Sequence, residues 1–253
     1  MATYKKRGYK NTNTANNSNS AEADSATAEV FEKLDSTASK TEEWVSKYQN
    51  FILAGIGTIA ISVLSYLAYQ KFVSEPKELE AVSELSQAQY YFDLAVNGQN
   101  SDSLFLRALN GGEGKYGFID IIENYSGTPA AKLATYSAGM AYLNLKDYKN
   151  AIDYLDDFNS DDILLSALSK GAIGDAFAQI DQQEEAYEYY VKAFESSDNL
   201  FSTPKYLYKA AMLGASLGKN SSALSYFKRI KSDYPDSTEA KLVEVQIGRL
   251  ENQ

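Results

Sequence analysis

Small residues recur at long, nearly regular intervals in the second half of this chain. Ala151, Ala186 and Ala223 are separated by 35 and 37 positions. Each is preceded, twelve positions earlier, by another small residue: Gly139, Gly174 and Ala211. A period of this length is typical of helical hairpins that stack side by side, because each hairpin buries its apolar face only against its neighbours. The period therefore predicts an all-α solenoid.

The residues around these small positions form three copies of one pattern. An aromatic residue follows three positions after the first small residue in two copies, as Tyr142 and Phe177, whereas the third copy has Gly214 there and is alone in ending on Pro235. The middle copy also places Lys170 where a large apolar residue is expected. The pattern resembles the tetratricopeptide repeat, whose period is about 34 residues. The resemblance implies these packing residues: Gly139, Tyr142, Ala151, Gly174, Phe177, Ala186, Ala211, Ala223 and Pro235.

The resemblance also sets the expected boundaries of a repeat domain over residues 76–253. Full repeats are expected at about 129–160, 163–198 and 204–236, after a degenerate repeat over 76–126 in which residues 116–125 pair with a long helix that Pro76 starts. Thr128 and Thr203 are expected N-caps, each followed by Pro at the first helical position, and Asp161 and Asp162 are the candidates for the middle copy. A capping helix is expected over 238–250, with Ala240, Val243, Ile247 and Leu250 on one face.

An uncharged apolar run precedes the repeats. Phe51 to Tyr69 is 19 residues long, flanked by Lys47 and Tyr48 before it and by Lys71 after it. As a helix it reaches roughly 28 Å, close to a hydrocarbon core of about 30 Å. We therefore predict a transmembrane helix over 51–70. A buried soluble helix would normally show a polar face, and a cleaved signal peptide would begin nearer the amino terminus.

The residues before this run predict two further segments. Residues 1–29 begin with a basic cluster, Lys5 to Lys10, and continue through Asn, Ser and Thr, a composition typical of disorder. A weak helical period then predicts a juxtamembrane helix over 30–50. The basic cluster favours a cytoplasmic amino terminus, because positive residues near a span tend to stay on that side. The repeat domain is then expected outside the cytoplasm.

Composition argues against most catalytic chemistry. The chain has no Cys and no His, so thiolates, imidazole bases and the commonest zinc ligands are excluded. Residues 111–115 vaguely resemble a phosphate loop, but Leu109 and Tyr116 replace its first Gly and its Ser or Thr. The net charge of −10, which lies wholly after the uncharged run, disfavours nucleic acid. We therefore expect no enzyme, no cofactor, no metal site and no small-molecule substrate.

The resemblance implies a protein-binding groove lined by the first helix of each repeat. Met140, Asp175 and Met212 stand where some family members have the Asn of a clamp that grips a carboxylate tail, so that clamp is not expected. A groove of Tyr, Met and Leu instead favours apolar or extended protein segments. The expected groove residues are Leu133, Tyr136, Met140, Leu143, Asn144, Asp175, Ala178, Gln179, Tyr208, Met212 and Ala215.

An amino-terminal anchor followed by such repeats is similar to the ancillary subunits of the bacterial Sec translocon and to related periplasmic envelope-assembly proteins. This similarity implies an inner-membrane protein whose periplasmic domain acts as a chaperone or accessory subunit at the translocon. A structural scaffold of another envelope complex, in secretion, cell-wall synthesis or division, is the alternative. The sequence does not name the partner or choose between a client chaperone and a fixed subunit.

Overall fold

The structure is a computed structural model that describes residues 23–98, 101–196 and 198–252. Its elements are helices, apart from one isolated bridge between Gly112 and Lys115 in the described chain. The all-α prediction is therefore confirmed. The helices are α1 Ala23–Tyr69, η1 Gln70–Ser74 (π-type), α2 Glu75–Asn97, α3 Ser101–Asn110, α4 Phe118–Asn124, α5 Pro129–Asn144, α6 Tyr148–Asp157, α7 Ile163–Gln179, α8 Gln183–Glu195, α9 Thr203–Ser216, α10 Asn220–Asp233, η2 Glu239–Lys241 (3-10) and α11 Val243–Glu251.

Two compact units divide the chain, Met1–Leu67 and Ala68–Gln253. Most of the first unit is the 47-residue helix α1. This helix begins at Ala23, inside the segment 1–29 for which we predicted disorder, and it covers both 30–50 and 51–69 without a break. The predicted juxtamembrane and transmembrane helices are thus one helix, since no Gly or Pro separates them. The prediction of disorder for residues 1–22 lies outside the described residues.

The apolar run forms the carboxy-terminal part of α1. Within the helical run Glu43–Asn97 an 18-residue window has a mean hydropathy of 2.1, and none of that window is buried. Phe51 is 77% exposed and Leu64 is 65% exposed. This is the one helix in the described chain long and apolar enough to cross a membrane. Its exposure sets it apart from the core helix of a soluble protein, which would be covered by its neighbours.

Two hydroxyl side chains in the same run satisfy their hydrogen bonds locally. Thr58 Oγ1 donates to the carbonyl of Ala54 at 2.9 Å, and Ser62 Oγ donates to the carbonyl of Thr58 at 2.8 Å. Both bonds reach back one turn of the same helix. No donor on these two side chains therefore needs water, which is the condition that a hydrocarbon environment imposes.

Pro76 lies in the first turn of α2, where we expected it, but no loop comes before it. The π-helical segment η1 joins α1 to α2, and Ser74 and Glu75 both have helical backbone angles. A proline in the first turn of a helix removes an N–H that would have no partner within that helix. Pro76 therefore marks the start of α2 without interrupting the helical backbone.

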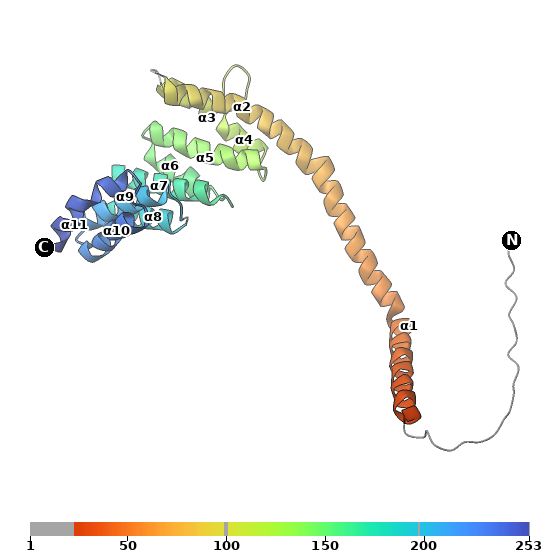
Figure 1. Cartoon of the computed structure of the whole chain (residues 1–253). Helices are drawn as coiled ribbons and strands as arrows, with labels where there is room; N and C mark the ends of the chain where they lie inside the picture. The colour runs from red at the N-terminus through yellow and green to blue at the C-terminus, as the bar shows by residue number, and fades with distance from the viewer. Residues whose placement is uncertain (1–22, 99–100, 197, 253) are drawn as a thin grey trace, which may run out of the picture. The chain divides into compact units, whose positions relative to one another are not determined.

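The second unit is a row of helical hairpins. The pairs α5–α6, α7–α8 and α9–α10 each fold back on themselves, and α6 packs on α7 as α8 packs on α9. Figure 1 shows these helices following one another from green to blue, with α11 at the end. Ala151, Ala186 and Ala223, the small residues of the second helices, are fully buried.

Small residues in the first helices allow the close approach within each hairpin. A Cβ atom on Gly139 would lie 2.5 Å from Cγ of Leu155, and one on Gly174 would lie 2.7 Å from the ring of Tyr190. Atoms at such distances overlap, so neither position has room for a side chain. Ala211 occupies the corresponding place in the third hairpin and is fully buried.

The region before these hairpins contains a helix that the sequence analysis did not identify. We expected residues 116–125 to pair with the long helix that Pro76 starts, but α2 packs chiefly on α3, while α4 lies against α5 and touches α2 less. Phe105, Ala108 and Leu109 of α3 are buried. The short helix α3 lies between turn-rich segments, so its helical period covers too few residues to stand out.

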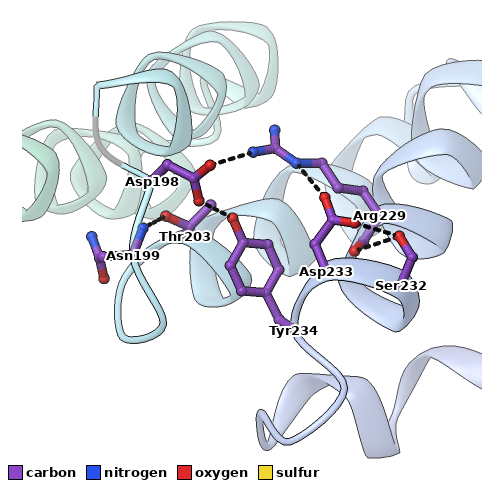
Figure 2. Close-up of polar contacts among 7 residues, drawn as sticks. All are labelled: Asp198, Asn199, Thr203, Arg229, Ser232, Asp233 and Tyr234. Atoms are coloured by element: carbon purple, nitrogen blue, oxygen red, sulfur yellow. Dashed lines mark hydrogen bonds and ion pairs between the residues drawn. The ribbon is translucent and has the colours of Figure 1, made fainter.

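Three helix starts test the predicted N-caps. Thr128 Oγ1 accepts a hydrogen bond from Ala131 N at 3.1 Å, and Asp162 Oδ1 accepts one from Leu164 N at 2.8 Å, as predicted. Thr203 is not an N-cap, because α9 already begins there and Ser202 precedes it. Its Oγ1 instead accepts a hydrogen bond from Asn199 N at 2.9 Å, which ties the α8–α9 loop to the start of α9 (Figure 2).

The carboxy-terminal end of the row follows the predicted pattern. Pro235 lies in the turn that follows α10. Val243 and Ile247 are buried, and Ala240 and Leu250 pack against the same cluster, which confirms the predicted apolar face. The first part of the expected 238–250 helix is the 3-10 turn η2 rather than α-helix.

Candidate protein-binding groove

All eleven expected groove residues lie on α5, α7 and α9, and none is fully buried. Asn144, Gln179 and Met212 are exposed, and the other eight are half-buried. The first helices of the three hairpins therefore share a face that solvent reaches. The structure does not bring all eleven together, however: three pack at a seam between two hairpins and three line a pocket. The other five belong to neither set: Leu133, Asn144, Asp175, Gln179 and Ala215.

The first place is the seam between the first and second hairpins. Tyr136, Met140 and Leu143 of α5 pack against a small buried cluster. That cluster consists of Leu155, Ala172 and Ile173. Much of the apolar surface of these α5 side chains is therefore used in holding α7 against the first hairpin, and less of it is open to a ligand.

The second place is a pocket between α7, α8 and α9. Its volume is about 350 Å³, and three expected groove residues line it, Ala178, Tyr208 and Met212. Five residues that the sequence analysis did not select complete the lining: Gln183, Tyr190, Lys209, Leu213 and Ser216. We call this the Met212 pocket, because Met212 is 40% exposed and belongs to both the groove and the pocket.

One carboxylate joins the helices around this pocket. Asp175 Oδ1 of α7 forms an ion pair with Lys209 Nζ of α9 and accepts a hydrogen bond from the Tyr190 hydroxyl of α8 at 2.7 Å. Lys209 Nζ also lies 5.4 Å from the centre of the Tyr190 ring, within range of a cation–π contact. The charges of Asp175 and Lys209 therefore neutralise each other beside the pocket.

Burial keeps the Tyr190 hydroxyl protonated. Desolvation raises the pKa of Tyr190 far above its ordinary value near 10, and the Asp175 carboxylate raises it further, because a phenolate would be repelled there. Burial likewise raises the pKa of Tyr206. Both side chains are thus neutral hydrogen-bond donors at any physiological pH, and neither is suited to act as a base.

Gly171 provides space for a ring that joins the second and third hairpins. A Cβ atom on Gly171 would lie 2.0 Å from Cε1 and Cζ of Tyr206, which is 3% exposed. The Tyr206 ring stacks at 6.5 Å on Tyr190. Only glycine allows α9 to place this ring against α7, so the support that the Tyr206 ring gives to the lining residue Tyr190 depends on that position.

Aromatic pairs also explain how the third copy departs from the repeat pattern. Tyr142 lies 5.3 Å from Tyr154, and Phe177 lies 5.3 Å from Tyr189, each within one hairpin. In the third hairpin a Cβ atom on Gly214 would lie 3.0 Å from the ring of Tyr187 in the preceding hairpin. Tyr187 of α8 thus occupies the space that an aromatic side chain at position 214 would need.

Comparison with known families agrees with this arrangement. Residues 134–157 match a tetratricopeptide repeat family, and residues 206–237 match a second one. The chain contains tetratricopeptide repeats. The matched segments cover the first and third hairpins in part, and the middle tetratricopeptide-like hairpin α7–α8 lies between them. A search of curated proteins found no match.

The register of the tetratricopeptide repeats could have revealed part of what the sequence analysis missed. Ser216 is the counterpart of Asn144 and Gln179, so the same period points to it. Tyr190 and Leu213 lie on other helical faces, and only the packing of three helices brings them to the pocket. Among the described residues, no three acidic side chains lie close enough to hold a metal ion.

Proposed function

We propose that this protein is a membrane-anchored module that binds other proteins through the groove face of its repeats. The observation on which this rests is the Met212 pocket, an apolar recess on the face shared by the first helices. Tetratricopeptide repeats generally serve protein–protein interaction, and exposed apolar recesses on stacked helices suit extended or helical segments. We assign the protein no catalytic activity and no cofactor.

The anchor in this proposal is the apolar part of α1. Its exposed apolar side chains and its internally bonded hydroxyls, those of Thr58 and Ser62, support insertion into a bilayer. The cluster Lys5 to Lys10 supports a cytoplasmic amino terminus. We therefore place the repeat unit in the periplasm, beside the inner membrane.

Within that setting we propose a periplasmic chaperone or accessory subunit at the protein translocon. The order of anchor and repeats supports this role by its similarity to the ancillary translocon subunits. A scaffold of another envelope complex is the second candidate. It is favoured by the seam residues Tyr136, Met140 and Leu143, because their packing against a buried cluster leaves less apolar surface for varied clients.

Photocrosslinking in intact membranes tests the binding role. A photoreactive amino acid replaces Met212 in the full chain, and a matched variant carries it at Val245 of α11, which is 76% exposed and lies outside the pocket. We expect crosslinks to envelope proteins from position 212 that are weak or missing from position 245. Crosslinks to soluble cytosolic proteins alone would contradict the proposal.

Two further measurements test the proposed location of the repeat unit and the choice between chaperone and scaffold separately. The chain has no Cys, so a single Val245→Cys substitution reports the location of the repeat unit through a membrane-impermeant maleimide. Labelling in cells with an opened outer membrane but an intact inner membrane supports the periplasmic assignment, and protection there opposes it. Suppression of client aggregation by the full chain in nanodiscs favours a chaperone, whereas no suppression favours a scaffold.

A further inference from the structure

The negative charge of the repeats is concentrated in one part of the row. Residues 147–198, which include α6, α7 and α8, contain thirteen acidic and three basic residues. Residues 199–253 contain five acidic and eight basic residues. The excess of acid in the first of these segments equals the −10 of the whole chain. Within it, residues 181–195, the α7–α8 turn and α8, carry five acidic residues and one basic residue. A ligand lying over α8 therefore meets a negative surface, which favours cationic segments.

The inside of the Met212 pocket differs from this negative surface, because its lining is mostly apolar and its one charged side chain already has an ion-pair partner. Ala178, Met212, Leu213 and the ring of Tyr208 contribute carbon surface to its lining. Lys209 is the charged lining residue, and its ammonium group is already paired with Asp175. An anionic group entering the pocket would have to compete with Asp175. A neutral apolar side chain would not, and it would bury the surface of Met212, a flexible residue that adapts to its contacts.

An acidic group lies beside the pocket on the side of α8. Gln183 Nε2, which belongs to a lining residue, donates a hydrogen bond to Asp181 Oδ1 at 3.3 Å. Asp181 is exposed in the α7–α8 turn and forms no ion pair within the described part of the chain. Glu184, the next acidic residue, is already paired with Lys219 at 2.6 Å. Asp181 is thus the carboxylate beside the pocket that is available to a ligand's cation.

We propose that the Met212 pocket takes one bulky apolar side chain, Phe or Leu, from a basic segment of a partner protein, and that Asp181 pairs with a Lys or Arg next to it. A volume of about 350 Å³ is at the small end of ligand sites, which suits one side chain rather than a larger ligand. The basic character of the segment follows from the charge of the α7–α8 turn and α8. The proposal rests on the proposed function and specifies the partner's chemistry.

Fluorescence anisotropy with synthetic peptides tests this proposal on the full chain in nanodiscs. The probe is a short labelled peptide of Ala, Gln and Lys with one central Phe. Two matched peptides replace the Phe by Ala or every Lys by Glu. We expect the first peptide to bind and the Ala peptide to bind at least about tenfold more weakly, as for loss of an anchoring side chain. We expect no binding of the Glu peptide.

Variants of the protein locate the site. Met212→Asp should weaken binding of the Phe peptide at least about tenfold, because it places a charge in the apolar recess. Val245→Asp is the control and should leave binding unchanged. Asp181→Asn, which tolerates the same positive φ of 62°, should weaken binding a few-fold and reduce its salt dependence. Ser216→Trp, an exposed position on the lining, should block the pocket without disturbing buried residues.

Equal binding of the Phe and Ala peptides, tighter binding of the Glu peptide, or full binding by both Met212→Asp and Ser216→Trp would overturn the proposal. Thermal unfolding followed by circular dichroism shows that each variant is folded. If no peptide binds while position 212 still crosslinks to envelope proteins, the pocket assignment is wrong and the proposed function stands. If neither occurs, the proposed function is wrong as well.

Discussion

The two units of this protein use similar apolar residues in opposite ways. In α1, Phe51 is 77% exposed, whereas Phe118 and Phe227 of the repeat unit are completely buried. The glycines show the same contrast, since a Cβ atom on Gly55 would have nothing within 4 Å, while one on Gly171 would overlap an aromatic ring. The repeat unit therefore gains its stability from close internal packing. The apolar surface of α1 is left for an environment outside the chain.

Among substitutions that test this contrast, Gly171→Ala is expected to lower the unfolding free energy of the repeat unit the most. The new methyl group overlaps the Tyr206 ring, which is buried and has little room to move, so the repeat unit should lose about 3 kcal/mol, the upper end of typical overpacking costs. Chemical unfolding of the full chain, followed by circular dichroism, measures the loss. A double variant with Tyr206→Leu should recover part of it, and strict additivity of the two changes would show that the contact is not the cause.

A smaller effect is expected from Tyr190→Phe, which removes the hydrogen bond to Asp175. The expected cost is about 1 kcal/mol, because Asp175 keeps its ion pair with Lys209. The substitution should also alter the pH dependence. The folded state raises the pKa of Tyr190, so its contribution is fully present below pH 10 and is lost as the pH rises above the unfolded value.

Unfolding free energies measured from pH 9 to pH 11 test this sign. The wild-type repeat unit should lose stability above pH 10, and Tyr190→Phe should lose less over the same interval. The remaining slope would reflect the other buried tyrosines, including Tyr206. A variant that follows the wild-type slope would show that Tyr190 ionises in the folded state as easily as in the unfolded one.

Gly214→Ala should have a much smaller effect than Gly171→Ala. Its methyl group would lie 3.0 Å from the edge of the Tyr187 ring, which is only half-buried and can shift by a few tenths of an ångström. Alanine also favours the helix over glycine by about 1 kcal/mol. The two contributions oppose each other, so the unfolding free energy should change by less than about 1 kcal/mol. A loss as large as that of Gly171→Ala would contradict the ranking by distance.

The smallest effect on the repeat unit is expected from Gly55→Ala. Nothing lies within 4 Å of the new methyl group, and Gly55 belongs to the other unit. The unfolding midpoint of the repeat unit should be unchanged, and α1 should become no less helical. The same circular dichroism experiment provides the measurement. A lowered midpoint would mean that the two units depend on each other for stability.

The sequence was sufficient to predict features that follow a regular period or depend on neighbouring residues. The register of small residues located three hairpins, and Thr128 and Asp162 were recognised as caps because their hydrogen bonds reach only two or three residues along the chain. Thr203 was wrongly predicted to be an N-cap. Its hydrogen-bond partner, Asn199, lies in the preceding loop, and the path of that loop depends on contacts with other helices. Tyr234 of the α10 end donates to Asp198 of that loop, a contact that no local pattern contains (Figure 2).

The candidate site was only partly predictable, because it too depends on contacts between residues that are far apart in the sequence. Three lining residues were selected from the repeat period and a fourth, Ser216, also follows it, but the Asp175–Lys209 pair joins residues 34 positions apart on two different helices. Whether the two charges meet depends on the rotation of α9 against α7. That rotation is fixed by the fit of Tyr206 over Gly171, which only the packed structure reveals.

The contacts between α7 and α9 have a consequence for how the repeats come apart. Tyr206 over Gly171 and Lys209 with Asp175 both join α9 of the third hairpin directly to α7 of the second, in addition to the packing of α8 on α9. Arrays of this kind often unfold piecemeal, one repeat after another. Here the loss of either hairpin exposes buried apolar surface on the other and breaks the Lys209–Asp175 ion pair, so the two should exchange their amide hydrogens as a single cooperative block.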